Sequence, residues 1–74
     1  MSQINFKGKV VYKNIEMGFW GIEANNGRKW LPVNLPSRLE KEGLEVEISG
    51  NTVDDFFSTI MWGDPIEITN YKIV

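Results

Sequence analysis

The residue types that most often carry out catalysis are missing from this chain of 74 residues. It has no histidine and no cysteine, which removes the usual general base, the commonest zinc ligands and every imidazole-activated nucleophile. None of its serines lies in a G-x-S-x-G sequence, and its glycines form neither G-x-G-x-x-G nor a P-loop. We therefore expect a protein that is not an enzyme and that uses no cofactor.

Carboxylates are a remaining group that could do chemistry, and they gather in two places. Asp54, Asp55 and Asp64 could offer oxygens to calcium or magnesium, but their spacing fits no calcium-binding loop. Glu45 and Glu47 would lie about 7 Å apart on one strand face, a separation that overlaps the one used by inverting glycosidases. A domain of this size offers little cleft for a sugar chain, so we interpret both groups as solvated and expect no metal site.

Aromatic and basic side chains are the other group with usable chemistry. Rings with lysines or arginines beside them bind single-stranded nucleic acid, because bases stack on the rings and phosphates contact the cations. The candidate binding face, on the first three predicted strands, consists of Trp30, Arg28, Lys7, Lys9, Phe19 and Glu23, with Lys13 as a further outward neighbour.

A second aromatic group lies late in the chain. Phe56, Phe57 and Trp62 are too many bulky apolar side chains for an ordinary exposed loop. They either pack back to plug one end of the domain or form an exposed apolar patch for a protein partner.

The charge is distributed unevenly along the chain, although the net charge is only −2. Six of the eight lysines and arginines lie in residues 1–38, and eight of the ten acidic residues lie in residues 39–74. Such a division predicts either that the two halves attract each other in the fold or that the first half forms a basic face.

An alternating pattern predicts the first strand. Apolar residues at Ile4, Phe6, Val10 and Tyr12 share one parity, while lysines occupy the other. Gly8 falls on the apolar parity, where a residue without a side chain indicates a bulge or sharp bend. One long strand could then take part in two sheets.

The sequence Asn26-Gly27 between two strand-like runs favours a hairpin with a two-residue turn. In that register Trp30 points outward, over Gly21 and beside Glu23. The residues expected in the core are then Trp20, Ile22, Leu31 and Val33. A three-residue turn would shift the register and bury Trp30 instead.

A short helix of one or two turns is predicted after the hairpin. Leu35 and Leu39 are four residues apart, Ser37 and Glu40 have capping-box spacing, and Gly43 suits the position after a helix. We expect this helix to cover one end of the core.

Two further strands are predicted in the second half of the chain. Residues 44–49 alternate between apolar and acidic or polar side chains, and residues 66–74 form the last strand. A loop is expected to begin at 50–51, and 63–65 has the composition of a turn or bulge.

Three strands, a short helix and two more strands follow the plan of an OB-fold, a partly open five-stranded barrel. We therefore predict a single all-β domain over residues 1–74, with its short helix between the third and fourth strands. An SH3-like barrel fits the length but explains the helix less well, and an open sheet covered by one helix is a third alternative.

Four motifs resemble those of a family of small uncharacterised prokaryotic domains. They are Gly18-Phe19-Trp20-Gly21-Ile22, Asn34-Leu35-Pro36, Gly43-Leu44-Glu45-Val46 and Met61-Trp62-Gly63. The likeness covers the chain from about Gly8 to Ile68 and implies an OB-like barrel. The resemblance implies no activity, because there is no established function of the family to transfer to this chain. Members often have a histidine just before the M-W-G element, where this chain has Ile60.

These features predict a protein that binds without catalysing a reaction. The leading expectation is a protein-interaction module that uses Phe56, Phe57 and Trp62 or an open strand edge. The alternative is weak binding of single-stranded nucleic acid on the face of the first three strands. A more distant alternative is a small ligand or an oligosaccharide bound at Trp30 and Glu23.

The sequence also gives expectations about location. No apolar stretch approaches the length of about 18 residues that a membrane span requires, and the first residues lack the apolar region of a secretion signal. We expect a cytoplasmic monomer with no membrane partner.

Overall fold

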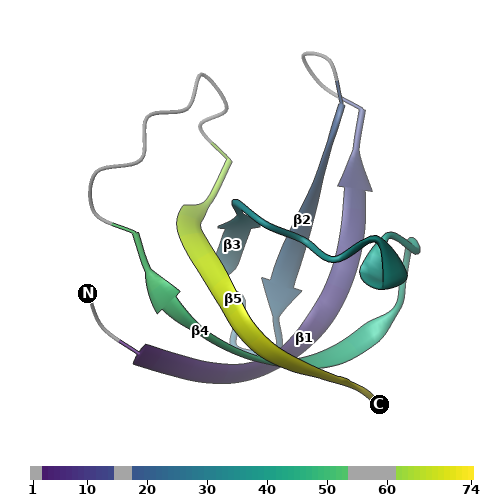
Figure 1. The fold of residues 1–74 in the computed structure, drawn as a ribbon. Coiled ribbons are helices and arrows are strands. Elements are labelled where there is room, and N and C mark those ends of the chain that lie inside the picture. The colour runs from purple at the N-terminus through teal and green to yellow at the C-terminus, as the bar shows by residue number, and fades with distance from the viewer. Residues whose placement is uncertain (1–2, 15–17, 54–61) are drawn as a thin grey trace.

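The computed structural model describes residues 3–14, 18–53 and 62–74, which form five strands and one short helix (Figure 1). The elements are β1 (Gln3–Lys13), β2 (Phe19–Ala24), β3 (Lys29–Pro32), the 3₁₀ helix η1 (Ser37–Leu39), β4 (Glu45–Thr52) and β5 (Asp64–Ile73). The strands close into a barrel in the order β1-β2-β3-β5-β4. This confirms the prediction of an all-β, OB-like barrel with its helix between the third and fourth strands.

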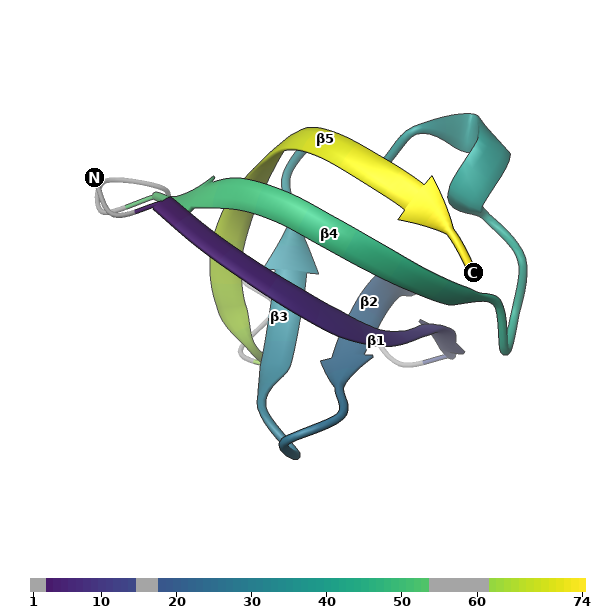
Figure 2. The ribbon, with the colours of Figure 1, turned by 90° about the horizontal axis from the view of Figure 1, so that it is seen from below.

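β1 belongs to both halves of the barrel, as predicted. Its residues Gln3–Lys9 pair with β4, and its residues Gly8–Lys13 pair with β2, so that it passes between the two strands (Figure 2). A Cβ at Gly8 would lie only 2.6 Å from the carbonyl oxygen of Glu23. The crossing point therefore requires glycine.

The barrel interior is filled by side chains from all five strands and from η1. Its buried cluster consists of Val10, Ile22, Ala24, Trp30, Leu39, Val46, Ile48, Ile66 and Ile68. Trp20 is half-buried against this cluster, with its ring edge-to-face with Tyr12. Burying one valine, leucine or isoleucine side chain contributes about 1.5–3 kcal/mol to the free energy of folding. The barrel interior is therefore the main source of stability.

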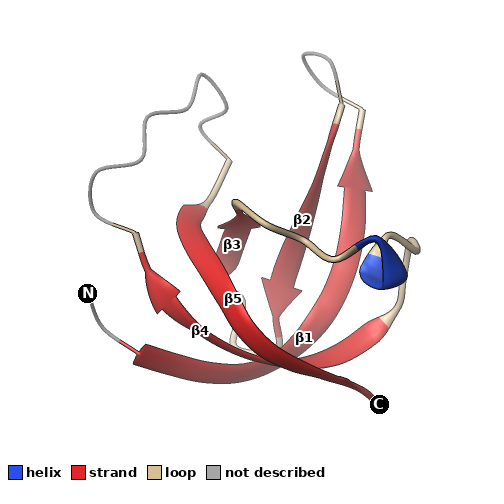
Figure 3. Cartoon of the chain, in the orientation of Figure 1, coloured by secondary structure: helices blue, strands red, loops and turns tan. Residues whose placement is uncertain are grey.

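The short helix is smaller than predicted and lies beside one end of the barrel (Figure 3). It has three residues, its N-cap is Pro36, and no side chain caps it, so the predicted capping box of Ser37 and Glu40 does not form. Leu39 is completely buried and anchors the helix to the core. Gly43 has a φ of +83°, but it lies four residues beyond the end of the helix. Within the described residues, no helix is long and apolar enough to cross a membrane.

The β2–β3 hairpin has a different register from the predicted one. Ala24 N donates to Arg28 O at 2.8 Å and Gly27 N donates to Ala24 O at 2.9 Å, so three residues form the turn. Gly27 has a φ of +90°, which suits the last residue of a three-residue hairpin loop. The prediction of a two-residue turn is therefore wrong.

The changed register decides which side chains face the core. Ile22 now lies opposite Trp30, and directly opposed residues share a face of the sheet. Trp30 is consequently buried, with 4% of its surface exposed, whereas Val33 is 38% exposed. The predictions of an outward Trp30 and an inward Val33 are both wrong.

The barrel closes through a short parallel pairing between β3 and β5, which matches Trp30 with Asp64 and Pro32 with Ile66. Beyond β3, Val33 N donates to Ile66 O at 2.9 Å. The side chain of Asn34 then makes two hydrogen bonds with the backbone of Ile68. The chain after β3 thus continues to bind β5 after the strand itself has ended.

Candidate binding site

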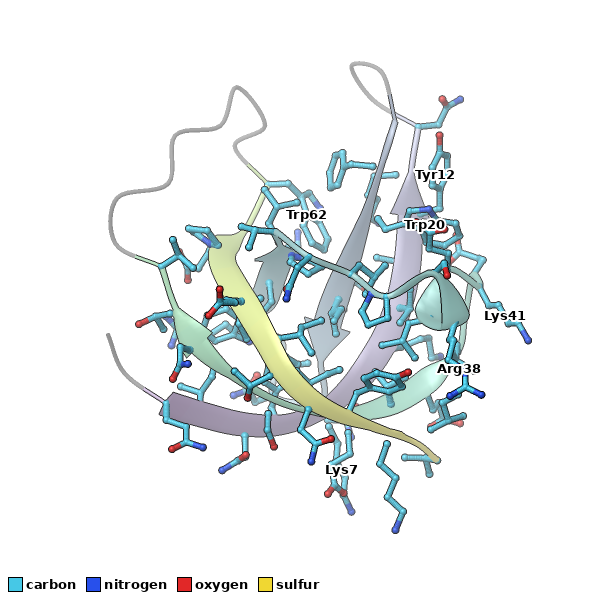
Figure 4. The ribbon with its side chains drawn as sticks, in the orientation of Figure 1. Lys7, Tyr12, Trp20, Arg38, Lys41 and Trp62 are labelled. Atoms are coloured by element: carbon cyan, nitrogen blue, oxygen red, sulfur yellow. The ribbon has the colours of Figure 1, made fainter. Side chains whose placement is uncertain are left out.

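An indole ring lies against the outer face of β2. Because Ile22 points into the barrel, its neighbour Gly21 faces outward. A Cβ at Gly21 would overlap the six-membered ring of Trp62, with Cζ3 as the nearest atom, so the ring packs directly on the glycine backbone. Phe19 contacts the same indole edge-to-face, with the ring centroids 5.5 Å apart. Figure 4 shows Trp62 beside β2.

Two lysines flank this indole. The Nζ atoms of Lys13, at the end of β1, and of Lys29, at the start of β3, each lie 5.7 Å from the Trp62 ring centroid. β1 and β3 are the two neighbours of β2 in the barrel, so the ammonium groups approach the ring from two different strands. At a partly exposed site, each cation–π contact is worth about 0.5–1 kcal/mol.

A cross-strand row of charges completes the site. Glu23 lies opposite Lys9 on one side and opposite Lys29 on the other, and its Oε2 is 3.6 Å from the Nζ of Lys13. Three lysines thus lie beside Glu23, and because Lys9 also lies opposite Glu45 of β4, these three lysines and two carboxylates sum to one positive charge. Lys9 and Lys29 are exposed, and the side chains of Lys13 and Glu23 are 36% and 41% exposed.

The floor of the site is apolar. Val11, Phe19 and Leu31 are buried although they alternate with core residues and so lie on the outer face. Both faces of the β2–β3 region therefore carry buried apolar side chains. An aromatic ring on an apolar floor with a basic rim can hold a flat group by stacking and an anion by charge attraction. We call the group of Trp62, Phe19, Gly21, Lys9, Lys13, Lys29 and Glu23 the Trp62 site.

The predicted centre of the binding face is not part of this site. The Trp30 ring stacks on Phe6 at a centroid distance of 5.6 Å, and the Cζ of Arg28 covers it at 4.6 Å. Arg28 in turn donates from Nη2 and Nε to Asp64 at 3.0 and 3.3 Å. Trp30 and Arg28 therefore contribute to packing and to an ion pair, and the prediction that Trp30 is exposed is wrong.

Part of the uneven charge is neutralised within the fold. Lys7 lies opposite Glu47, with Nζ 3.8 Å from Oε2, and Lys9 lies opposite Glu45. Lys72 of β5 faces Glu47 from its other side. The basic first strand is thus paired with the acidic fourth strand, which is one of the two arrangements that the sequence predicts.

The other predicted groups fall partly outside the described residues. Phe56 and Phe57 lie there, so the predicted interaction loop stays a prediction, and its third member, Trp62, packs on Gly21. Asp54 and Asp55 also lie there. Asp64, the third of the carboxylates considered for metal binding, is paired with Arg28.

The structure brings together Phe19, Glu23 and Lys9 from the predicted face with Trp62 from the predicted loop. Sequence reasoning missed Lys29, because the two-residue turn would have placed it on the inner face. The signal that could have found it is the register itself: a three-residue turn puts Lys29 directly opposite Glu23.

Comparison of the chain with protein-family models, curated proteins and solved structures gave no match. The geometry of the site is therefore the basis on which a function can be inferred.

Proposed function

We propose that this protein is a non-catalytic binding module that takes single-stranded nucleic acid on the Trp62 site. In this proposal a base stacks on the indole and the flanking lysines contact phosphates, with the domain acting as a cytoplasmic monomer. The observation that carries it is the Trp62 ring, placed over Gly21 between the ammonium groups of Lys13 and Lys29.

The position of the site within the fold supports the proposal. OB-folds bind oligonucleotides and oligosaccharides on the face of their second and third strands and on the loops beside it. The Trp62 site lies on this face, and Trp62 itself lies two residues before the start of β5. The ammonium groups of Lys13 and Lys29 beside the ring favour an anionic strand over a neutral sugar chain.

The same geometry predicts weak binding. A stacked base contributes about 1–3 kcal/mol, and few cations surround the ring. We expect binding that is measurable at low salt and that weakens steeply as salt is added, because each phosphate contact releases counterions.

The direct test is a fluorescence titration with oligothymidylate and oligouridylate at low and moderate salt. Trp20→Phe serves as the background, because it removes a second half-buried indole. The strand should quench Trp62, and Trp62→Ala should abolish the quenching. Lys13→Gln and Lys29→Gln should each weaken binding and flatten its salt dependence.

Lys72→Gln is the matched control, because it removes one exposed lysine from β5, away from the Trp62 site. It should leave the affinity within about twofold, since an exposed charge at a distance is screened by salt. Absence of quenching in the parent protein at low salt would overturn the proposal. Equal losses in the Lys72 and Lys29 variants would show attraction to net charge without a site.

A further inference from the structure

A carboxylate lies in the middle of the proposed nucleic-acid site. Glu23 is opposed by Lys9 and Lys29 and approached by Lys13, and 41% of its side chain is exposed, so its oxygens can be reached from solvent. A site that only attracted phosphates would bind more strongly without this negative charge. An exposed ion pair adds about 0–1 kcal/mol to stability. The ion pair of Glu23 therefore does little for stability, and its place in the site calls for another explanation.

The chemistry of a carboxylate restricts what it can recognise on a base. It has two acceptor oxygens and no donor. Guanine presents two adjacent donors on one edge, the ring N1–H and the amino group at C2, and both can bond to the two oxygens at once. Adenine and cytosine offer one amino group beside an acceptor nitrogen. Thymine and uracil offer one N–H between two carbonyl oxygens, which repel the second carboxylate oxygen.

The placement of Glu23 fits this role. Gly21, on which the Trp62 ring packs, and Glu23 are two residues apart on one face of β2, a separation of about 7 Å. Trp62 is partly buried, and a base that stacks on the part of its indole left in contact with solvent can extend its edge toward Glu23. Bases of single strands are commonly read in this way, by stacking on an aromatic ring and hydrogen bonding at an edge.

We propose that Glu23 gives the Trp62 site a preference for guanine, through a two-oxygen hydrogen bond to the base stacked on Trp62. This inference rests on the proposed function and specifies which base the site prefers. The lysines supply affinity that is independent of sequence, and Glu23 supplies the discrimination.

The test compares three short oligothymidylates that cover the about 4–16 nucleotides bound by one OB-fold. One is unmodified, one has a single central guanine, and one has inosine at that position, which keeps the N1–H and lacks the amino group. We expect the guanine strand to bind about tenfold more tightly than the unmodified strand, which is the size of a good two-hydrogen-bond base contact. The inosine strand should fall between the two.

Glu23→Gln is the decisive variant. It removes the negative charge and keeps the length of the side chain, so it should bind the unmodified strand more tightly and lose the preference for guanine. Glu47→Gln removes the same charge from β4 and should keep the preference. The measured quantity is the ratio of the two dissociation constants in each protein, and binding of the unmodified strand shows that each variant is folded.

Each failure has its own meaning. If the parent protein binds none of the strands, the proposed function and this inference are both overturned. If it binds all three equally, the function stands and the guanine preference is overturned. If Glu23→Gln retains the ratio of the parent protein, the preference does not come from Glu23 and the inference is again wrong.

Discussion

The side chain of Asn34 hydrogen-bonds to both backbone groups of Ile68. Its Nδ2 donates to the Ile68 carbonyl at 3.0 Å, and its Oδ1 accepts from the Ile68 N–H at 2.8 Å. The amide side chain thus replaces a neighbouring strand where β3 has already ended at Pro32. Both bonds are partly buried, so the backbone of β5 depends on them for hydrogen-bond partners.

Asn34→Ala should therefore destabilise the barrel. A buried backbone group that loses its partner costs about 1–3 kcal/mol, and two groups are affected, so we expect one of the larger losses among polar substitutions. Urea unfolding followed by tryptophan fluorescence measures it. Asn70→Ala is the control, because the Asn70 side chain accepts an exposed hydrogen bond from the N–H of the adjacent Tyr71. Equal stability losses in the two variants would contradict a closing role for Asn34.

Trp30→Ala should cost far more stability than Trp62→Ala. Truncating a buried tryptophan costs about 3–5 kcal/mol, and Trp30 is packed between Phe6 and Arg28. Trp30→Phe provides a milder variant that should still fold. If Trp62→Ala were as destabilising as Trp30→Ala in urea unfolding, the outer indole would be a core residue and unsuitable as a stacking surface.

Gly21→Ala should displace the Trp62 ring. A methyl group at this position overlaps the indole, and the ring has to move. In the Trp20→Phe background we expect Trp62 emission to shift to longer wavelength and acrylamide quenching to increase, while Trp30 stays protected. Nucleic-acid binding should weaken in the same variant. Gly27→Ala is the control, since a Cβ there meets no atom within 4 Å. An unchanged Trp62 emission in Gly21→Ala would disprove the contact between the Trp62 ring and the Gly21 backbone.

Gly27→Ala should destabilise the hairpin through its backbone alone. Gly27 has a φ of +90° and free space around it, so the cost is that of a left-handed conformation, about 1–2 kcal/mol. Gly27→Asn should cost less, because asparagine tolerates this region better than alanine. Thermal unfolding of the three proteins gives the ranking glycine, asparagine, alanine; a stable alanine variant would contradict the three-residue turn.

The barrel could be predicted from the sequence because its large features are local. The alternation in β1, the glycine at its crossing point and the order of the elements together indicate an OB-like barrel. The strand limits were less accurate: β4 continues to Thr52 and β5 begins at Asp64, where a loop and a turn were expected. Both segments gain partners from distant strands, which local composition does not report.

The site could not be predicted because it depends on one residue of register. A two-residue and a three-residue turn are both compatible with the sequence around Gly27, and the choice reverses the faces of Trp30 and Lys29. The pattern of apolar residues in β3 could not decide between the two turns, because Trp30 and Leu31 point to opposite faces and both are buried. Trp62, forty-one residues after Gly21 in the chain, fills the surface that Trp30 was expected to cover.

The parallel pairing of Trp30 with Asp64 also bears on when the proposed site forms. Barrels built from such distant pairings fold slowly, in about milliseconds to seconds, because long loops must close before their contacts form. The Trp62 ring, on which the proposed binding depends, lies two residues before the strand that completes the barrel. A chain that has formed only its first three strands therefore lacks the indole over Gly21, and the proposed site arises together with the finished fold.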